Sequence, residues 1–435
     1  MAPTIIISTI TFIAIITSLI LFPKIKIGRL HISIYWMIAL LGAAILLIFS
    51  LAPANEVFNQ LTVDSKINPI KILVLFFSMT LLSVFLDEFG LFKYLANLAA
   101  KNAKGNQYIL FFSFYLLVAI LTVFTSNDVV ILTFTPFICF FCKRTKINPL
   151  PYLIAEFAAA NTWSLMFIIG NPTNIFLGTS AQIDFINYAK IMALPTLAAG
   201  LMEIGIIFLL FNRKLRTKIE IPHEEENVIQ NKLMLIVGVV HLGLCLVFLV
   251  ISSYINIEMW LISLICATSL LLFTIIMSFI KKENWFYVTT GLKRLPYPLI
   301  PFFLSMFVIV VALNYQGITT EIVKLFGENH TIWIYGYSSF LASNLINNIP
   351  MSILYSGLCS HLSETIYLPA IYSSIIGSNL GAFLTPMGAL AGIMFTNLLS
   401  EHDVKFSFLD FIKYGAIISL PVVTTALAVL YLMFL

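Results

Sequence analysis

One polar stretch inside an apolar hairpin constrains the fold more than any other feature of the sequence. Residues 124–130 include Thr, Ser, Asn and Asp and lie between two apolar runs, 108–123 and 131–142. Each run is helical in composition but shorter than the ~20 residues that a full membrane span needs. An acid that faces lipid at mid-depth costs roughly 2.5–3.5 kcal/mol or more, and unpaired backbone groups add to this. We therefore expect the tip of a helical hairpin, buried in protein or lining a wet cavity.

Three further interruptions of the same kind occur, at residues 170–174, 343–348 and 377–381. A single Asn or Gly in a membrane helix is typical of packing, but four such breaks in symmetric positions favour one shared substrate site. Amide and hydroxyl groups at these breaks satisfy backbone freed by unwound turns and offer donors and acceptors to a ligand. The predicted binding residues are Ser126, Asn127, Asp128, Asn171, Thr173, Asn174, Ser343, Asn344, Asn347, Asn348, Ser378, Asn379 and Thr385.

The amino-acid composition indicates that these breaks lie in membrane helices. The 435 residues are 60% hydrophobic and only 10% charged, whereas a soluble domain carries about 25% charged residues. The apolar run at 5–22 is followed by basic residues rather than a small-residue cleavage site, so we interpret it as the first helix and not a signal peptide. The expected fold class is an all-α polytopic membrane protein.

The order of the segments predicts two similar halves. Each half contains membrane helices, then a hairpin, a broken helix and a closing helix. The N-terminal half, 1–211, has three helices, a cytoplasmic-side hairpin at 107–143, a broken helix at 152–185 and a closing helix; a cytoplasmic linker covers 212–231; the C-terminal half, 232–435, has scaffold helices, an outer-side hairpin at 332–360, a broken helix at 366–399 and the last helix.

The distribution of Lys and Arg sets the expected orientation. Placing the basic loop 24–29 in the cytoplasm leaves only Lys66, Lys71, Lys190 and Lys324 of the 24 basic residues outside. The N-terminus is then outside the plasma (inner) membrane, and the two hairpins enter from opposite sides. Inverted repeats with paired broken helices are typical of secondary transporters that bind substrate near the bilayer midplane.

The charge at the breaks leaves several ligand classes open. The four breaks contain no Lys or Arg and a single acid, Asp128. A large anion would have to depend on helix dipoles and bound cations, a neutral polyhydroxy solute needs only mixed donors and acceptors, and a cation would use Asp128 with carbonyl and hydroxyl oxygens.

Residues outside the breaks are expected to have structural roles. We interpret Asp87 and Glu88 as interfacial anchors, Glu156 as an acid at a cytoplasmic helix end, and Cys139 and Cys142 as small buried hydrophobes. No phosphate-binding loop, metal-ligand cluster or nucleophile–base pair is present, so we expect no enzyme activity, no cofactor, no bound metal except a coupling ion, and no nucleic-acid partner.

Several motifs resemble those of the ion-transporter superfamily, and most closely its arsenite/antimonite permeases. The matching runs are Leu86 to Gly90, Ser126-Asn127-Asp128 with Leu132 to Pro136, Asn344 to Pro350, Ile376 to Gly381, and Leu384 to Ala391. The permeases usually carry an acid where Asn379 stands here, and Pro-Lys where Ala382-Phe383 stands.

This resemblance implies a scaffold and a transport domain, hairpins that meet at mid-membrane, and elevator-like alternating access. Relatives include sodium-coupled dicarboxylate carriers and sodium/proton antiporters, whose Ser-Asn motifs surround sodium ions. Such sites would correspond to Ser126-Asn127 and Ser343-Asn344. The expected partners are a small inorganic ion or neutral oxyacid, the lipid bilayer, and either a soluble ATPase subunit or a second copy of the chain.

Three functions follow as hypotheses. The first is a carrier that exports a small inorganic solute such as arsenite; the second is an anion or carboxylate importer coupled to sodium or protons; the third is a sodium/proton antiporter. Sodium dependence distinguishes the second, and a requirement for Asp128 distinguishes the third. The direction of transport, the stoichiometry, the coupling ion and the oligomeric state do not follow from the sequence.

Overall fold

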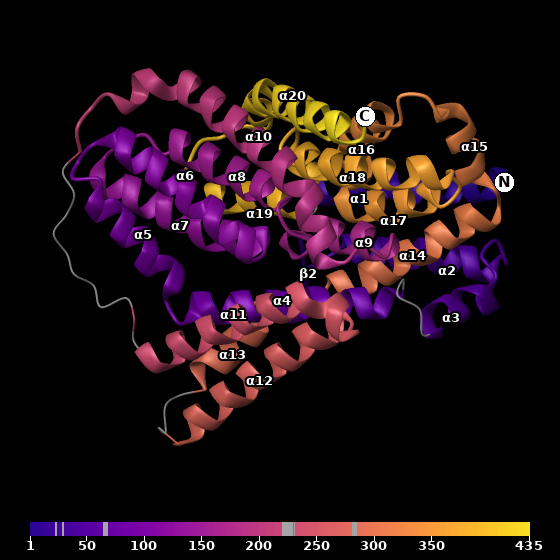
Figure 1. Ribbon diagram of the computed structural model, residues 1–435, viewed down its shortest axis with the longest axis horizontal. Helices are drawn as coiled ribbons and strands as arrows, with labels where there is room; N and C mark the ends of the chain where they lie inside the picture. The colour runs from indigo at the N-terminus through magenta and orange to yellow at the C-terminus, as the bar shows by residue number, and fades with distance from the viewer. Residues whose placement is uncertain (22–23, 28–29, 64–67, 220–228, 230, 281–284) are drawn as a thin grey trace.

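The computed structural model is a bundle of helices of the length and composition that membranes require (Figure 1). It describes residues 1–21, 24–27, 30–63, 68–219, 229, 231–280 and 285–435. Within these residues, six helices are long and apolar enough to cross a bilayer, or seven if α14 and α15, bent by 75°, form one span. The expected polytopic membrane fold is therefore confirmed.

The N-terminal half is built from apolar helices interrupted where the sequence becomes polar. The tip of its hairpin lies between α6 and α7, and its broken helix is interrupted between α8 and α9, which we call the first break; the second break lies between α18 and α19. The elements are α1 (Ala2–Leu21), β1 (Lys24–Ile27), β2 (Leu30–Ser33), α2 (Tyr35–Ile48), α3 (Ala54–Thr62), α4 (Pro69–Glu88), α5 (Leu91–Asn102), α6 (Gln107–Phe124), α7 (Asn127–Thr145), α8 (Leu150–Trp163), the 3-10 turn η1 (Ile168–Gly170), α9 (Pro172–Ser180), α10 (Phe185–Phe211) and the 3-10 turn η2 (Asn212–Leu215).

The C-terminal half follows the same order from its hairpin onward. The elements are α11 (Lys232–Ile255), α12 (Met259–Ile280), α13 (Phe286–Lys293), α14 (Leu299–Tyr315), α15 (Ile318–Phe326), α16 (Thr331–Ile346), α17 (Asn348–Cys359), α18 (Glu364–Gly381), the 3-10 turn η3 (Pro386–Gly388), α19 (Leu390–Glu401) and α20 (Phe408–Met433).

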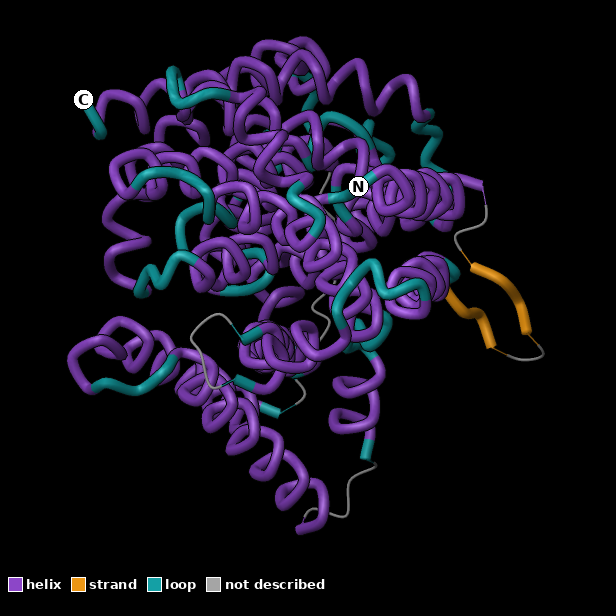
Figure 2. The backbone as a smooth tube through the Cα atoms, turned by 90° about the vertical axis from the view of Figure 1, so that its right-hand side faces the viewer, coloured by secondary structure: helices purple, strands orange, loops and turns teal. Residues whose placement is uncertain are grey.

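Three polar connections contain more structure than the sequence predicted. The fold is all-helical as expected except for two four-residue strands, β1 and β2, which pair antiparallel at the edge of the molecule (Figure 2). The polar stretches after α2 and α14 contain α3 and α15, because their apolar residues recur at helical spacing and pack against the core. Half of the expected linker, residues 220–228 and 230, and Lys66 lie outside the described residues.

The two broken helices lie inside the bundle and are covered by other helices. In Figure 1, α10 and α20 pack together along the top, α16 lies on α18, and α6 lies on α8. Helices α4, α11, α12 and α13 form the lower part, and α4 also contacts α7 and α9. Helix α8 is buried along almost its whole length and α18 is buried from Pro369 to Gly381, so these two helices form the centre of the packing.

The two breaks have the same layout. In each, four extended or turn residues follow the first helix, a three-residue 3-10 turn follows them, and one extended residue precedes the next helix. That extended residue is Asn171 with φ −150° in one break and Ala389 with φ −150° in the other. Gly170 is required because a Cβ there would overlap the carbonyl oxygen of Ser164, and a Cβ on Gly388 at the matching position would lie 2.8 Å from the Gly381 carbonyl oxygen.

Candidate functional site

A hydrogen-bonded amide pair joins the two halves at their breaks. The side-chain amide of Asn379, in the last turn of α18, donates to Asn174 Oδ1 of α9 at 2.6 Å. Asn379 Oδ1 accepts from the Ser164 hydroxyl at 3.0 Å, and Asn174 donates to the Ser164 carbonyl at 2.8 Å. All three residues are fully buried. Two predicted residues from the two halves of the chain therefore meet, and Ser164 is a partner that was not among the predicted residues.

The tip of the second hairpin is held tightly to the second break. Asn344, near the end of α16, donates to the Gly381 carbonyl at 2.9 Å. Its oxygen accepts from the backbone N–H of Thr385 at 3.0 Å and from the Thr385 hydroxyl at 2.7 Å. Asn347, which has φ +71° between α16 and α17, donates to the Met387 carbonyl at 3.1 Å. These bonds satisfy backbone groups that the break leaves without helical partners.

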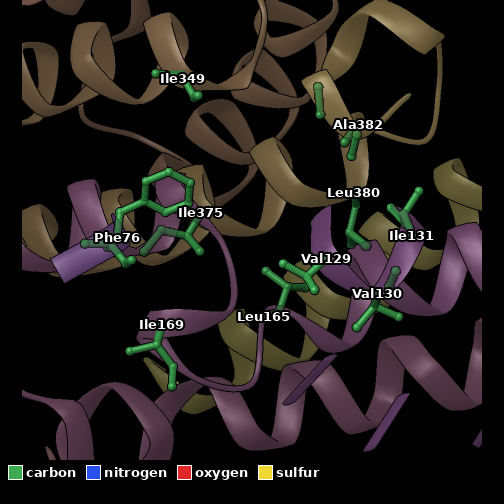
Figure 3. Packing of buried hydrophobic residues seen from close by; sticks show 14 of the residues in the cluster. Phe76, Val129, Val130, Ile131, Leu165, Ile169, Ile349, Ile375, Leu380 and Ala382 are labelled. Atoms are coloured by element: carbon green, nitrogen blue, oxygen red, sulfur yellow. The ribbon is translucent and has the colours of Figure 1, made fainter. Parts of the chain in front are cut away.

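Among the described residues, the tip of the first hairpin meets α8 through a single contact between two side-chain amides. Asn127, the first residue of α7, donates to Asn161 Oδ1 of α8 at 3.4 Å. Behind the tip, Figure 3 shows Val129, Leu165 and Leu380 pointing toward one another in the buried core. The first hairpin therefore touches both broken helices, mainly through apolar packing.

We call eight of these residues the polar centre; five of them form one hydrogen-bonded group, and the other three hold the second hairpin to the break after α18. It contains one or more residues from each of the four predicted breaks, together with Asn161 of α8, Ser164 directly after α8, and Thr385 after α18. Its members are Asn127, Asn161, Ser164, Asn174, Asn344, Asn347, Asn379 and Thr385.

The remaining predicted residues lie next to the polar centre with different environments. Asn171 caps α9 and accepts from the N–H and hydroxyl of Thr173, both at 3.1 Å. The Ser343 hydroxyl bonds within its own helix, and Asn348 is buried at the start of α17. The hydroxyls of Ser126 and Ser378 are buried and, among the described residues, have no hydrogen-bond partner.

Asp128 is half-buried in the first turn of α7. Its backbone N–H bonds to the Asn127 side chain at 2.9 Å. No hydrogen bond or ion pair of its carboxylate occurs within the described part of the chain. Its carboxylate therefore lies at a hairpin tip without a fixed partner among the described residues.

The interpretation of Asp87 and Glu88 as interfacial anchors is wrong. Both carboxylates are largely buried at the end of α4, where Arg294 contacts Asp87 at 2.6 Å and Glu88 at 2.7 Å. Burial alone would lower the pKa of the Arg294 guanidinium, but the two carboxylates outweigh it and raise that pKa above its ordinary value. Thr133 of α7 also donates to Asp87 at 2.7 Å, so this cluster ties the first hairpin to α4.

Two other acids lie deeper than the sequence indicated. Glu156, expected at a cytoplasmic helix end, is 1% exposed, and the Thr135 hydroxyl of α7 lies 3.1 Å from both of its carboxylate oxygens. Glu203 in α10 is 2% exposed and bonds to Tyr115 and Thr162. Glu203 was not among the predicted residues, although a lone acid in the apolar run 191–211 is a signal that indicates a buried acid.

The chemistry of the polar centre is neutral. Four helices end at the breaks (α6, α8, α16 and α18) and four begin there (α7, α9, α17 and α19), so partial charges of both signs meet and offset one another. Cavities of about 400 and 240 Å³ lie elsewhere, between α1 and α2 and beside Phe124 and Phe167, and both are lined mainly by apolar residues. In the described part of the chain, no three His, Cys, Asp or Glu residues form a metal-binding group.

Comparison with known proteins decides the family. The family model described as citrate transporter matches residues 12–377, which is most of the chain. The chain belongs to the citrate transporter family. This transporter is also 25% identical over 371 residues to an arsenical pump membrane protein of Escherichia coli, covering 82% of this chain and 85% of that one. A putative arsenical pump membrane protein of Bacillus subtilis is 26% identical over 427 residues, covering 88% and 90% of the two chains.

A solved structure supports the fold of the transporter. The YdaH transporter of Alcanivorax borkumensis matches with a TM-score of 0.51 and 13% identity, covering 99% of this chain and 97% of that one. These findings confirm the predicted resemblance to the ion-transporter superfamily and its arsenite permeases. The protein is therefore a multi-pass integral membrane transporter.

Proposed function

We propose that the protein is a secondary active transporter that exports a small inorganic solute of the arsenite or antimonite kind across the plasma membrane. Arsenite is an uncharged trihydroxy acid at neutral pH, so it needs hydrogen-bond donors and acceptors rather than a counter-charge. The observation that carries this proposal is the uncharged contact of Asn379 with Asn174 and Ser164 between the two halves. Individual bonds of about 0.5–1.5 kcal/mol net hold such a solute loosely enough to release it.

We further propose that the two halves are inverted repeats that move by an elevator-like mechanism, with the N-terminus outside. The identical layout of the two breaks and the position of a hairpin before each of them support this arrangement. The likeness to arsenical pump membrane proteins over more than four fifths of the chain supports the substrate class.

The test is metalloid flux. Everted membrane vesicles that contain the protein should take up arsenite when energised, and vesicles with Asn379→Leu should take up much less while holding the same amount of folded protein. Asn397→Ala, an exposed residue on α19, is the matched control and should behave as the unmodified protein. Arsenite uptake equal to that of empty vesicles would refute the proposal.

A second candidate is a sodium- or proton-coupled transporter of an anion or carboxylate. The family model's description as citrate transporter favours it, as do the buried hydroxyls of Ser126 and Ser378 that lack a partner among the described residues. Of the two expected sodium positions, Ser126-Asn127 fits better than Ser343-Asn344, because both side chains of the latter pair already bond to backbone or to Thr385. Citrate uptake that depends on external sodium would favour this candidate.

A third candidate, sodium/proton antiport, depends on Asp128. An antiporter would lose proton exchange when this carboxylate is replaced, whereas a carrier of a neutral solute would still exchange its solute. A soluble ATPase subunit or a second copy of the chain as partner stays a prediction, which purification from native membranes under mild detergent would test.

A further inference from the structure

A buried carboxyl group lies between three helices outside the polar centre. Glu203 of α10 accepts a hydrogen bond from Tyr115 of α6 at 2.9 Å and another from Thr162 of α8. The Tyr115 hydroxyl in turn accepts from the indole N–H of Trp163 at 3.0 Å. The carboxyl group is 2% exposed and lies within a helix that is long and apolar enough to span the membrane.

This cluster can satisfy both protonation states of the carboxyl group. The Tyr115 proton has two acceptors at the same distance of 2.9 Å, Glu203 Oε1 and the Gly200 carbonyl. When Glu203 is ionised, Tyr115 and Thr162 both donate to it. When Glu203 is protonated, it donates to the Thr162 hydroxyl, and Tyr115 turns its proton to the Gly200 carbonyl. The change requires only the rotation of hydroxyl groups, so neither state leaves the carboxyl group without a partner.

The groups that face Glu203 carry no compensating charge. Tyr115 is the titratable side chain from α6, while Thr162 and Trp163 from α8 do not titrate. In the described residues, no acid or base of α11, α20 or η2 forms a hydrogen bond or ion pair with Glu203. A carboxyl group in this position without a fixed cation can gain and lose a proton without breaking an ion pair.

The same cluster is connected to the polar centre through the end of α8. Thr162 and Trp163 are the last two residues of α8 and lie directly between Asn161, which contacts the first hairpin, and Ser164, which contacts Asn379. Trp163 also packs closely on the backbone at Gly200, because a Cβ there would meet its ring at 2.6 Å. A change in the hydrogen bonds of Glu203 therefore acts on the turn that carries the substrate-facing residues.

We propose that Glu203 is the proton-binding residue that couples proton movement to solute export. This proposal rests on the proposed function. A proton binds to the Glu203 carboxylate from one side of the membrane, and the same proton leaves to the other side after the solute has moved. Neither of the other two candidate acids has this set of partners. Asp128 has no donor for its carboxylate among the described residues, and Glu156 has a single hydroxyl.

The test distinguishes the coupling of proton movement to arsenite export from arsenite transport itself. Purified protein in liposomes is assayed for arsenite exchange at equal concentrations, for arsenite accumulation driven by a proton gradient, and for the internal pH change that arsenite produces. Glu203→Gln keeps the shape of the side chain but does not titrate. We expect it to keep exchange and to lose both the accumulation and the pH change. Glu203→Asp should restore part of the accumulation with a shifted pH profile.

Matched variants control for folding and position. Glu156→Gln replaces an equally buried acid and should accumulate arsenite as the unmodified protein does. All variants should elute as the same monodisperse species and unfold at similar temperatures. Full accumulation by Glu203→Gln, or the loss of exchange in a correctly folded Glu203→Gln protein, would each overturn the proposal.

A direct proton readout distinguishes this proposal from the proposed function. If the unmodified protein moves no arsenite, the proposed function fails, yet infrared difference spectra after a pH jump still report on the carboxyl group. A protonated-carboxyl band that titrates in the unmodified protein and is missing in Glu203→Gln supports the role of Glu203 as a proton-binding residue. Identical difference spectra for the two proteins would refute it.

Discussion

The contact between the two halves can be measured as a coupling energy. A double-mutant cycle with Asn379→Ala, Asn174→Ala and the double variant isolates the interaction of the two side chains from their other contacts. The 2.6 Å bond between them is direct, and both residues also bond to Ser164, through its side chain and its carbonyl. Interhelical hydrogen bonds in membranes average about 0.6 kcal/mol and reach about 1.7 kcal/mol.

The geometry places this pair near the upper end of that range. Both amides are fully buried, and truncating one leaves the other partner unsatisfied, which costs about 1–3 kcal/mol for a buried group. We expect each single variant to lose about 2 kcal/mol of unfolding free energy and the coupling energy to be about 1–1.7 kcal/mol. The assay is reversible denaturation in mixed micelles, with Asn397→Ala expected to lie within about 0.5 kcal/mol of the unmodified protein.

The result that refutes this reasoning is additivity. If the two single losses simply sum in the double variant, the two breaks are not energetically joined through these amides. The polar centre would then be two separate half-sites rather than one. If the cycle gives the expected coupling energy but the three variants transport arsenite as the unmodified protein does, the pair stabilises the fold and does not bind the substrate.

Three further predictions concern residues outside this pair. Arg294→Ala should lower the unfolding free energy by about 3–5 kcal/mol, because it leaves two buried carboxylates without their cation; a loss below about 1 kcal/mol by the same denaturation assay would contradict the buried ion pair. The double variant Cys139→Ser/Cys142→Ser should keep metalloid flux into everted vesicles, since a pair of thiolates would hold a trivalent metalloid too tightly to release it; abolished flux in a folded protein would make the thiols the site. Asp128→Asn should reduce flux more than Glu156→Gln, because only Asp128 lies at a hairpin tip, and equal mild effects would count against a role for it.

The positions of the helices and of their breaks could be predicted from the sequence for a physical reason. A polar residue within an apolar run is visible in one dimension, and the bilayer leaves few ways to accommodate it. Asn127, Asn174, Asn344 and Asn379 were therefore identified from local pattern alone, and each has a cross-element partner in the structure.

The partners themselves could not be predicted, because they lie far away along the chain. Arg294 is 206 residues from Glu88 and lies in a short loop that the sequence gives no reason to connect with α4. The position of Glu203 inside an apolar run indicates burial, but it does not indicate which side chains surround the carboxyl group. The contacts that define its environment come from two other helices, α6 and α8.

The unequal attachment of the two hairpin tips has a mechanical consequence. Asn344 and Asn347 fasten the second tip to its break with four bonds of 2.7–3.1 Å, whereas a single 3.4 Å contact, close to the limit of a hydrogen bond, holds Asn127 to Asn161. The first tip is therefore less firmly attached than the second. Its displacement would break one side-chain contact and no hydrogen bond to the backbone of the neighbouring break. We therefore expect water and solute to reach the protein interior first along the first hairpin. Access past the second hairpin would require this hairpin and the break after α18 to move together.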